Sequence, residues 1–130
     1  MKMSIDHWEG ITCRDEETVA TRVEEVESFI RRLDQDKHTV VCLGDPDRLS
    51  LMVGGGEGDY LVTATLDGEN WSTMAVGPQD GTRKLVVTGG QPGDFPSHVI
   101  VTLDQALATA RYFFLHTTID PSMTWITYQG

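Results

Sequence analysis

Residues 60–75 read YLVTATLDGENWSTMA and indicate the fold most clearly. Apolar and polar side chains alternate from Tyr60 to Leu66, the pattern of a half-buried β-strand. Asp67-Gly68 follows, a dipeptide favoured in the two-residue type I′ turn of a β-hairpin. With a two-residue loop, Leu66 pairs with Glu69 and Ala64 with Trp71. One face of this hairpin is then largely polar, and the other collects the apolar residues Tyr60, Val62, Ala64, Leu66, Trp71 and Ala75.

Further strands are expected on both sides of this hairpin. Short β-branched or alternating runs predict strands at 38–43, 49–53, 84–88, 98–101 and 123–128, with weaker candidates at 10–13 and 17–20. Gly54 to Gly58 is expected to be a turn between two antiparallel strands. Residues 89–96 contain so much glycine and proline that we expect a surface loop without regular structure.

Two segments have the apolar periodicity of amphipathic helices. The first runs from Thr21 to Leu33, and Thr21 with Glu24 has the spacing of a capping box. The second follows Thr102, which forms the same box with Gln105, and ends near His116. The predicted stripe of the first helix is Val23, Val26, Ile30 and Leu33. That of the second is Leu103, Leu107, Ala110 and Phe114, widened by Ala106 and Phe113.

These elements predict an α+β fold. We expect an antiparallel β-sheet of about six strands, with both amphipathic helices packed on one face. The 130 residues are the length of one domain, so residues 1–130 are expected to fold as a single unit.

Charge and composition exclude several classes of function. Ten basic against twenty acidic residues give a net charge of −10, which disfavours binding nucleic acid through a basic patch. No apolar run reaches the roughly 18 to 20 residues of a membrane span, and Met1 to Gly10 lacks the apolar core of a signal peptide. Cys13 and Cys42 have no partner motif, which fits free thiols in a reducing compartment. We therefore expect a cytoplasmic protein that binds neither membrane nor nucleic acid.

Motifs for catalysis and for metal binding are also missing from the sequence. The four histidines are scattered without a second ligand at helix or turn spacing, and no Gly-x-Ser-x-Gly nucleophile elbow occurs. The glycines at 54–58 precede a predicted strand, and Glu57 and Asp59 would repel a phosphate. We expect no catalytic residue, no cofactor and no metal.

The second half of the chain resembles a known family. The resemblance lies in the order and spacing of Gly58-Asp59-Tyr60, Gly89-Gly90 before Phe95-Pro96, Val101-x-Leu103-Asp104 before Ala110-Arg111-Tyr112-Phe113, and Pro121 four residues before Trp125. Over Thr21 to Tyr128, these features resemble immunity protein family 1 of bacterial polymorphic toxin systems. The sequence departs from the pattern at Thr118 to Pro121, which lacks the glycine of a Gly-x-x-Pro turn.

The resemblance implies a non-enzymatic antitoxin that binds a cognate toxin protein and neutralises it inside the producing cell, often a nucleic-acid deaminase or nuclease. The acidic composition fits a basic partner of that kind. We expect toxin contacts from residues on turns and loops beside the sheet, with helix carboxylates as a second choice. The first group is Glu57, Asp59, Glu69, Asp94 and Phe95, and the second is Glu24, Glu25 and Glu27.

Two other classes of function remain open at this point. One is a small-molecule or peptide-binding regulatory module, and the other is a small enzyme that uses carboxylates in a cleft beside residues 89–96. Neither has a motif behind it, and the oligomeric state is not determined by the sequence.

Overall fold

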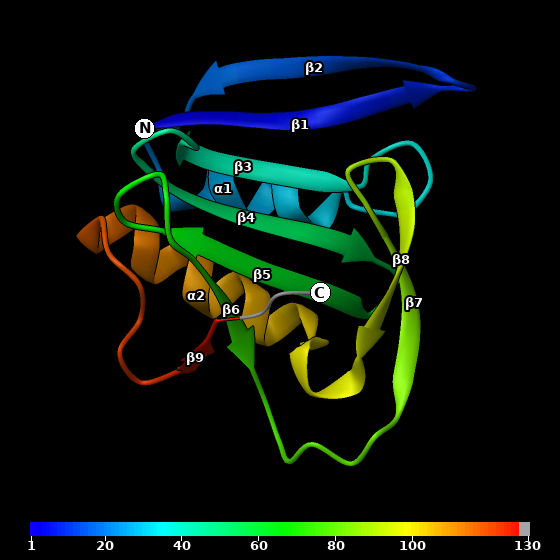
Figure 1. The fold of residues 1–130 in the computed structure, drawn as a ribbon. Coiled ribbons are helices and arrows are strands. Elements are labelled where there is room, and N and C mark those ends of the chain that lie inside the picture. Colours follow the sequence, from blue (N-terminus) through cyan, green and yellow to red (C-terminus); the bar gives the residue numbers. More distant parts are fainter. Residues whose placement is uncertain (128–130) are drawn as a thin grey trace.

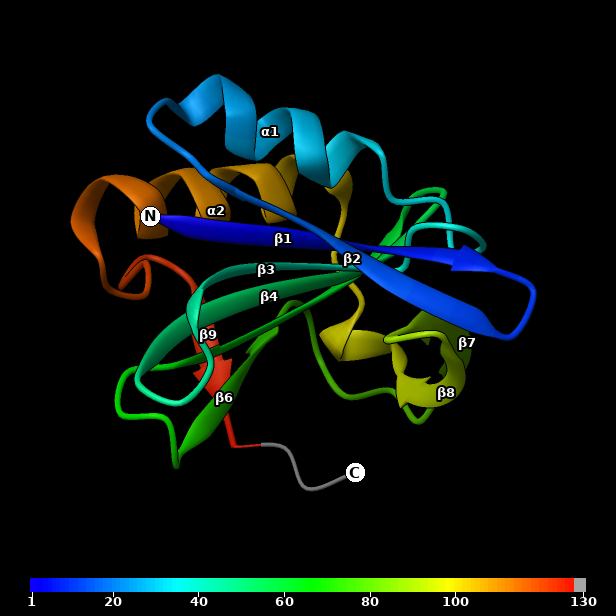
Figure 2. The ribbon, with the colours of Figure 1, turned by 90° about the horizontal axis from the view of Figure 1, so that it is seen from above.

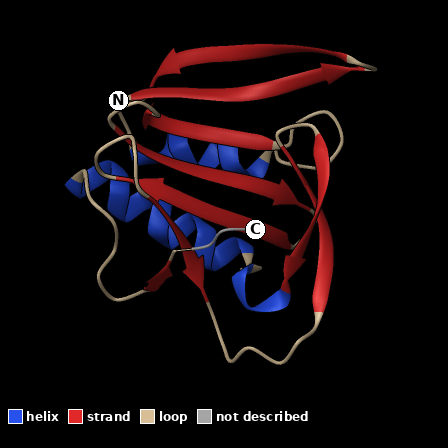
Figure 3. Ribbon diagram, viewed as in Figure 1, coloured by secondary structure: helices blue, strands red, loops and turns tan. Residues whose placement is uncertain are grey.

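The computed structural model describes residues 1–127 and has the expected α+β fold. Seven antiparallel strands form one sheet in the order β2-β1-β3-β4-β5-β6-β9, and β7 and β8 form a separate hairpin. Both helices cover the same face of the large sheet (Figures 1 and 2). Residues 1–127 contain nine strands, more than the six or so expected, because the segments 2–9, 12–19 and 91–96 are also extended (Figure 3).

The strands of the large sheet are β1 Lys2–Glu9, β2 Thr12–Val19, β3 Val40–Asp45, β4 Leu49–Gly56, β5 Asp59–Thr65, β6 Trp71–Ala75 and β9 Thr124–Ile126. The hairpin consists of β7 Arg83–Thr88 and β8 Gln91–Pro96. The helices are α1 Val23–Arg31 and α2 Leu103–His116, with a 3-10 turn at Ser97–Val99.

The core lies between the sheet and the two helices. Alternate strand residues point into it, so that Ile5, Val41, Leu51 and Val62 are fully buried. The predicted helix stripes are largely confirmed, because the structure buries Val26, Ile30 and Leu33 from the first segment, and Ala106, Leu107, Ala110 and Phe113 from the second. Ala106 and Phe113, which were expected to widen the stripe of α2, are fully buried, whereas Leu103 and Phe114 are only partly buried.

The two predicted helix caps have different outcomes. Thr102 caps α2 in a full capping box with Gln105, as expected. The box expected between Thr21 and Glu24 is wrong, since α1 begins at Val23 and the Thr21 backbone N–H and hydroxyl both donate to Glu25. The first turn of α1 therefore begins two residues later than expected.

The register expected for the central hairpin is also wrong. Thr65 pairs with Trp71 and Ala64 with Ser72, so the loop between β5 and β6 spans residues 66–70. The Asp67 carboxylate accepts hydrogen bonds from the backbone N–H groups of Glu69 and Asn70, both at 2.8 Å, which stabilises a loop longer than two residues. The one-residue shift exchanges the faces of β6. Met74 is fully buried in place of Trp71, and Leu66 is 51% exposed.

Residues 89–96 are not the irregular loop that we expected. Gly89 and Gly90 both have positive φ and form a two-residue turn, after which Gln91 to Pro96 pair with Thr88 to Arg83. The sequence signal was present in Gly89-Gly90, a dipeptide suited to a type I′ turn. The prolines of β8 do not prevent pairing because β8 has a neighbour on one side only.

Several further predicted strands differ from the structure mainly in their bounds or type. The weak strand candidates near residues 10–13 and 17–20 belong to one eight-residue strand, β2, which pairs along its whole length with β1. The strand expected at 98–101 is a 3-10 turn followed by an isolated bridge between Val101 and Tyr60. The last strand is confirmed at Thr124–Ile126, and Tyr128 lies outside the described residues.

Candidate functional site

Eight carboxylates of the described chain are exposed and have neither an ion pair nor a side-chain hydrogen bond. Six of the twenty acidic residues form ion pairs with arginine, lysine or histidine, and others cap turns through hydrogen bonds. Those left over are Asp15, Glu17, Glu24, Asp36, Asp47, Glu57, Glu69 and Asp104. Their negative charge is not offset by an ion pair within the described residues.

Asp15 and Glu17 lie side by side on β2, which is the outer strand of the β1–β2 hairpin and an edge of the sheet. Asp15 is opposite Asp6 and Glu17 is opposite Ser4, so both carboxylates face the side of the sheet that the helices leave uncovered. A hollow of about 360 Å³ adjoins them, with Lys2, Cys42 and Met52 among its lining residues. A partner that enters this hollow meets two unpaired carboxylates.

The buried carboxylate of Asp6, in the middle of β1, connects this hairpin to the rest of the sheet. It is 5% exposed and accepts hydrogen bonds from the backbone N–H groups of Thr39 at 2.6 Å and Val40 at 3.0 Å, and from the Trp8 indole at 2.8 Å. The Thr39 hydroxyl also donates to Asp6. Because a buried charge is stable only when it is fully hydrogen-bonded, this arrangement makes Asp6 a structural residue that joins β1 to the start of β3.

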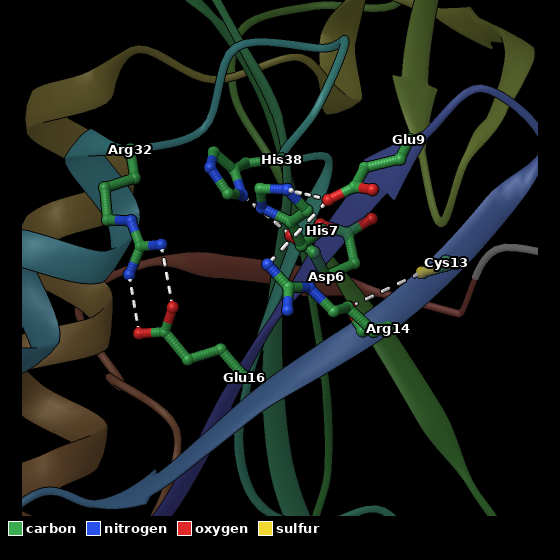
Figure 4. A network of polar contacts seen from close by, with 8 residues as sticks. All are labelled: Asp6, His7, Glu9, Cys13, Arg14, Glu16, Arg32 and His38. Carbon is green, nitrogen blue, oxygen red and sulfur yellow. Dashed lines mark hydrogen bonds and ion pairs between the residues drawn. The ribbon is translucent and has the colours of Figure 1, made fainter.

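The helix side of β2 carries a second polar cluster (Figure 4). The Arg32 guanidinium of the α1 C-cap donates to both oxygens of Glu16, at 2.8 and 3.0 Å, and this pairing lowers the pKa of Glu16. His7 lies 3.3 Å from Glu9, and its ring is 5.1 Å from the ring of His38. The ion pair between Glu16 and Arg32 connects the hairpin to the helix layer. The charged groups of this cluster are therefore engaged with one another.

The contact residues expected from the sequence do not form one patch. Asp59 and Asp94 are each held in an ion pair by a residue of β7, Asp59 by Lys84 at 2.8 Å and Asp94 by Arg83 at 3.0 Å. Phe95 is half-buried opposite Lys84. Glu57 occupies the β4–β5 turn nearby, whereas Glu69 lies beyond the opposite end of β5, about 20 Å away by the rise of the strand.

The α1 carboxylates differ from one another in the same way. Glu25 accepts from Thr21, which lowers its pKa, and Glu27 pairs with Arg111 of α2 at 2.8 Å. Glu24 is exposed and unpaired. Three expected residues, Glu24, Glu57 and Glu69, are therefore among the eight exposed, unpaired carboxylates. Asp15 and Glu17 also belong to these eight, but they were not predicted as contacts from the sequence. Their run of acidic residues was visible, but without the strand pairing nothing placed them beside a hollow.

Two general properties of the described residues complete the site. Over residues 1–127, no cluster of three or more histidine, cysteine, aspartate or glutamate side chains is arranged to hold a metal ion. Neither helix in that range has the length and apolar character needed to cross a membrane.

Comparison with known proteins assigns the chain to a family. A search of curated proteins gave no match. The family model of immunity protein Imm1 matches residues 14–127, which is most of the chain and includes β2 from Arg14 onward, both helices and the β7–β8 hairpin. The chain therefore belongs to the immunity protein Imm1 family, the antitoxins of polymorphic toxin systems that neutralise a cognate toxin.

Proposed function

We propose that this immunity protein neutralises a toxin that acts on nucleic acid, a deaminase or a nuclease, in the cytoplasm of the producing cell. It does so by binding the toxin directly and occluding or distorting its active site. The observation that carries this proposal is the set of eight exposed, unpaired carboxylates on a molecule of net charge −10.

The negative charge of this protein complements the positive charge expected on such a toxin. An enzyme that acts on nucleic acid holds phosphates with lysine and arginine, so its cleft has a positive potential. Opposite potentials raise the association rate by about 10 to 10³ and discriminate against partners of the wrong sign. The free carboxylates supply such a potential without first breaking internal ion pairs.

The residues proposed to contact the toxin differ in exposure and in whether they already have a partner within the protein. Glu24, Glu57 and Glu69 remain proposed contacts because they are exposed and unpaired. Asp59, Asp94, Glu25 and Glu27 must first give up arginine, lysine or threonine partners, and Phe95 is half-buried. These five are weaker proposals, and Asp15 and Glu17 are stronger ones.

Co-expression with the toxin domain encoded beside the gene tests the proposal. We expect growth to be rescued and the two proteins to elute as one complex in gel filtration. Nucleic acid extracted from cells that express the toxin alone should show deaminated bases or strand breaks. No rescue and no complex would reject neutralisation of this toxin, and rescue from a toxin with another substrate would reject only the nucleic-acid assignment.

A further inference from the structure

We propose that the toxin is bound by strand addition: a basic, extended toxin segment pairs with the free edge of β2, and Ile11 at the hairpin tip anchors it. This inference rests on the proposed neutralisation by direct binding and identifies the surface and the kind of segment bound. It depends on four features of the β1–β2 hairpin, namely its backbone, its exposure, its charge and its adjoining hollow.

The backbone of β2 has a row of hydrogen-bonding groups directed away from the sheet. Met1 and Ala20 exchange both of their backbone hydrogen bonds, at 2.8 and 3.0 Å, in the register that continues along β1 and β2. In an antiparallel ladder such bonded pairs alternate with non-bonded ones. Thr18, Glu16, Arg14 and Thr12 therefore bond to β1, and the N–H and C=O groups of Cys13, Asp15, Glu17 and Val19 point outward. None of these four N–H groups has a partner within residues 1–127.

The hairpin is also the most exposed part of the sheet. All eight residues of β2 are exposed, and β1 pairs with β3 only over Met3 to Ile5. The tip of the hairpin therefore projects beyond β3 (Figures 1 and 2). At its tip Ile11 is 98% exposed, and Val19 at the other end of β2 is 60% exposed. An apolar side chain presented in this way gains stabilisation only when a partner covers it.

Charge selects a basic toxin segment over a second copy of this chain. β2 carries Asp15, Glu16 and Glu17 against the single Arg14. Pairing two β2 strands would bring these carboxylates together, and like charges on paired strands are destabilising. Lysine or arginine side chains of an added strand would instead lie beside Asp15 and Glu17.

The two faces of an added strand would meet different surroundings. On the uncovered face its side chains reach Asp15, Glu17 and the hollow of about 360 Å³. On the helix side they meet Glu16, which Arg32 already holds. The basic residues of the toxin segment should therefore alternate and face the hollow.

Two variants at one position separate backbone pairing from charge. Glu17→Gln and Glu17→Pro remove the same charge, but only proline removes the outward N–H, and the ladder to β1 keeps its hydrogen bonds. We expect the proline variant to bind the purified neighbouring toxin domain about tenfold more weakly than the glutamine variant. Circular dichroism and thermal unfolding check that both variants fold.

Hydrogen–deuterium exchange of the wild-type protein gives a second test that needs no variant. The outward amides of Cys13, Asp15, Glu17 and Val19 should become protected when the toxin domain binds. Equal affinities of the two variants together with no protection, while the wild type still binds, would overturn strand addition and leave neutralisation intact. Absence of wild-type binding would overturn both. A wild-type dimer that the proline variant converts to a monomer would show that a second copy occupies the edge.

Discussion

At the scale of single residues, Gly90 shows how closely the two β-hairpins are packed. A methyl group at Gly90 would overlap the Trp8 indole, and the Gly90 N–H donates to the Thr39 hydroxyl at 2.8 Å. Trp8 and Thr39 both donate to Asp6. The turn of the β7–β8 hairpin therefore packs against two residues that donate hydrogen bonds to Asp6 of β1.

Gly90→Ala is therefore expected to destabilise the protein more than Gly89→Ala. Both glycines have positive φ, so each alanine variant pays a backbone cost of about 1 kcal/mol. Only Gly90 adds a collision, since a methyl group at Gly89 meets no atom within 4 Å. We expect a total loss of about 2 to 4 kcal/mol for Gly90→Ala in urea unfolding. Equal losses for the two variants would show that the Trp8 contact has no energetic role.

Ile11→Ser tests the proposed anchor at the hairpin tip. Because Ile11 is 98% exposed, the free energy of unfolding should change by less than about 0.5 kcal/mol. Affinity for the toxin domain should fall about fivefold to tenfold, as for an interface residue worth more than about 1 kcal/mol. Leu115→Ser is the control, because Leu115 is an exposed apolar residue, 59% exposed, that lies on α2 and not at the hairpin tip. Calorimetric titration measures the affinity of each variant for the toxin domain. Equal affinities would contradict the role of Ile11 as an anchor.

At the scale of elements, the predictions from sequence succeed where packing imposes a periodicity. The stripes of α1 and α2 and the alternation in β5 are visible because one face of each is preferentially buried. β2 buries none of its eight residues, so its sequence carries no hydrophobic period. β8 reads Gln-Pro-Gly-Asp-Phe-Pro and is extended only through its pairing with β7. A strand that is extended only because it pairs with a neighbouring strand cannot be recognised from its local composition.

The β5–β6 loop shows the same limit, and it gives a prediction about pH. Hydrogen bonds from Asn70 and Glu69 hold the pKa of Asp67 far below its ordinary value. The stabilisation from ionised Asp67 is therefore complete above the unfolded-state pKa of about 4, and it is lost as the pH falls toward the lower folded-state pKa. Asp67→Asn should lower the melting temperature at pH 7, and its difference from wild type should shrink below about pH 4. A difference that stays constant from pH 7 to pH 2 would contradict this account.

At the scale of the whole molecule, the net charge can be read directly from the sequence, whereas the arrangement of the charged residues on the surface cannot. Net charge is a sum over residues and needs no fold, whereas a contact surface depends on which strands lie at the edge. Glu69 and Glu57 are twelve residues apart in the sequence and lie at opposite ends of β5. Asp15 and Glu17 adjoin the hollow only because β1 pairs with both β2 and β3. Topology therefore decides which carboxylates act together.

Electrostatic attraction on this scale predicts a strong dependence of association on salt. The Debye length shortens from about 30 Å at 0.01 M to about 3 Å at 1 M ionic strength, so steering by the free carboxylates should disappear over this range. We expect the association rate with the toxin domain to fall by about 10 to 10³, while the dissociation rate changes little. Stopped-flow fluorescence measures both rates.

The variant Asp15→Asn, Glu17→Gln, Glu24→Gln, Glu57→Gln provides the control for this dependence. It removes four of the exposed, unpaired carboxylates and takes the net charge from −10 to −6. Because these side chains make no hydrogen bond or ion pair within residues 1–127, the fold should be retained. Its association rate should be lower at low salt and should converge with the wild-type rate at 1 M. Parallel salt curves for the two proteins would mean that other charges steer the encounter, and the proposed acidic surface would then have no part in it.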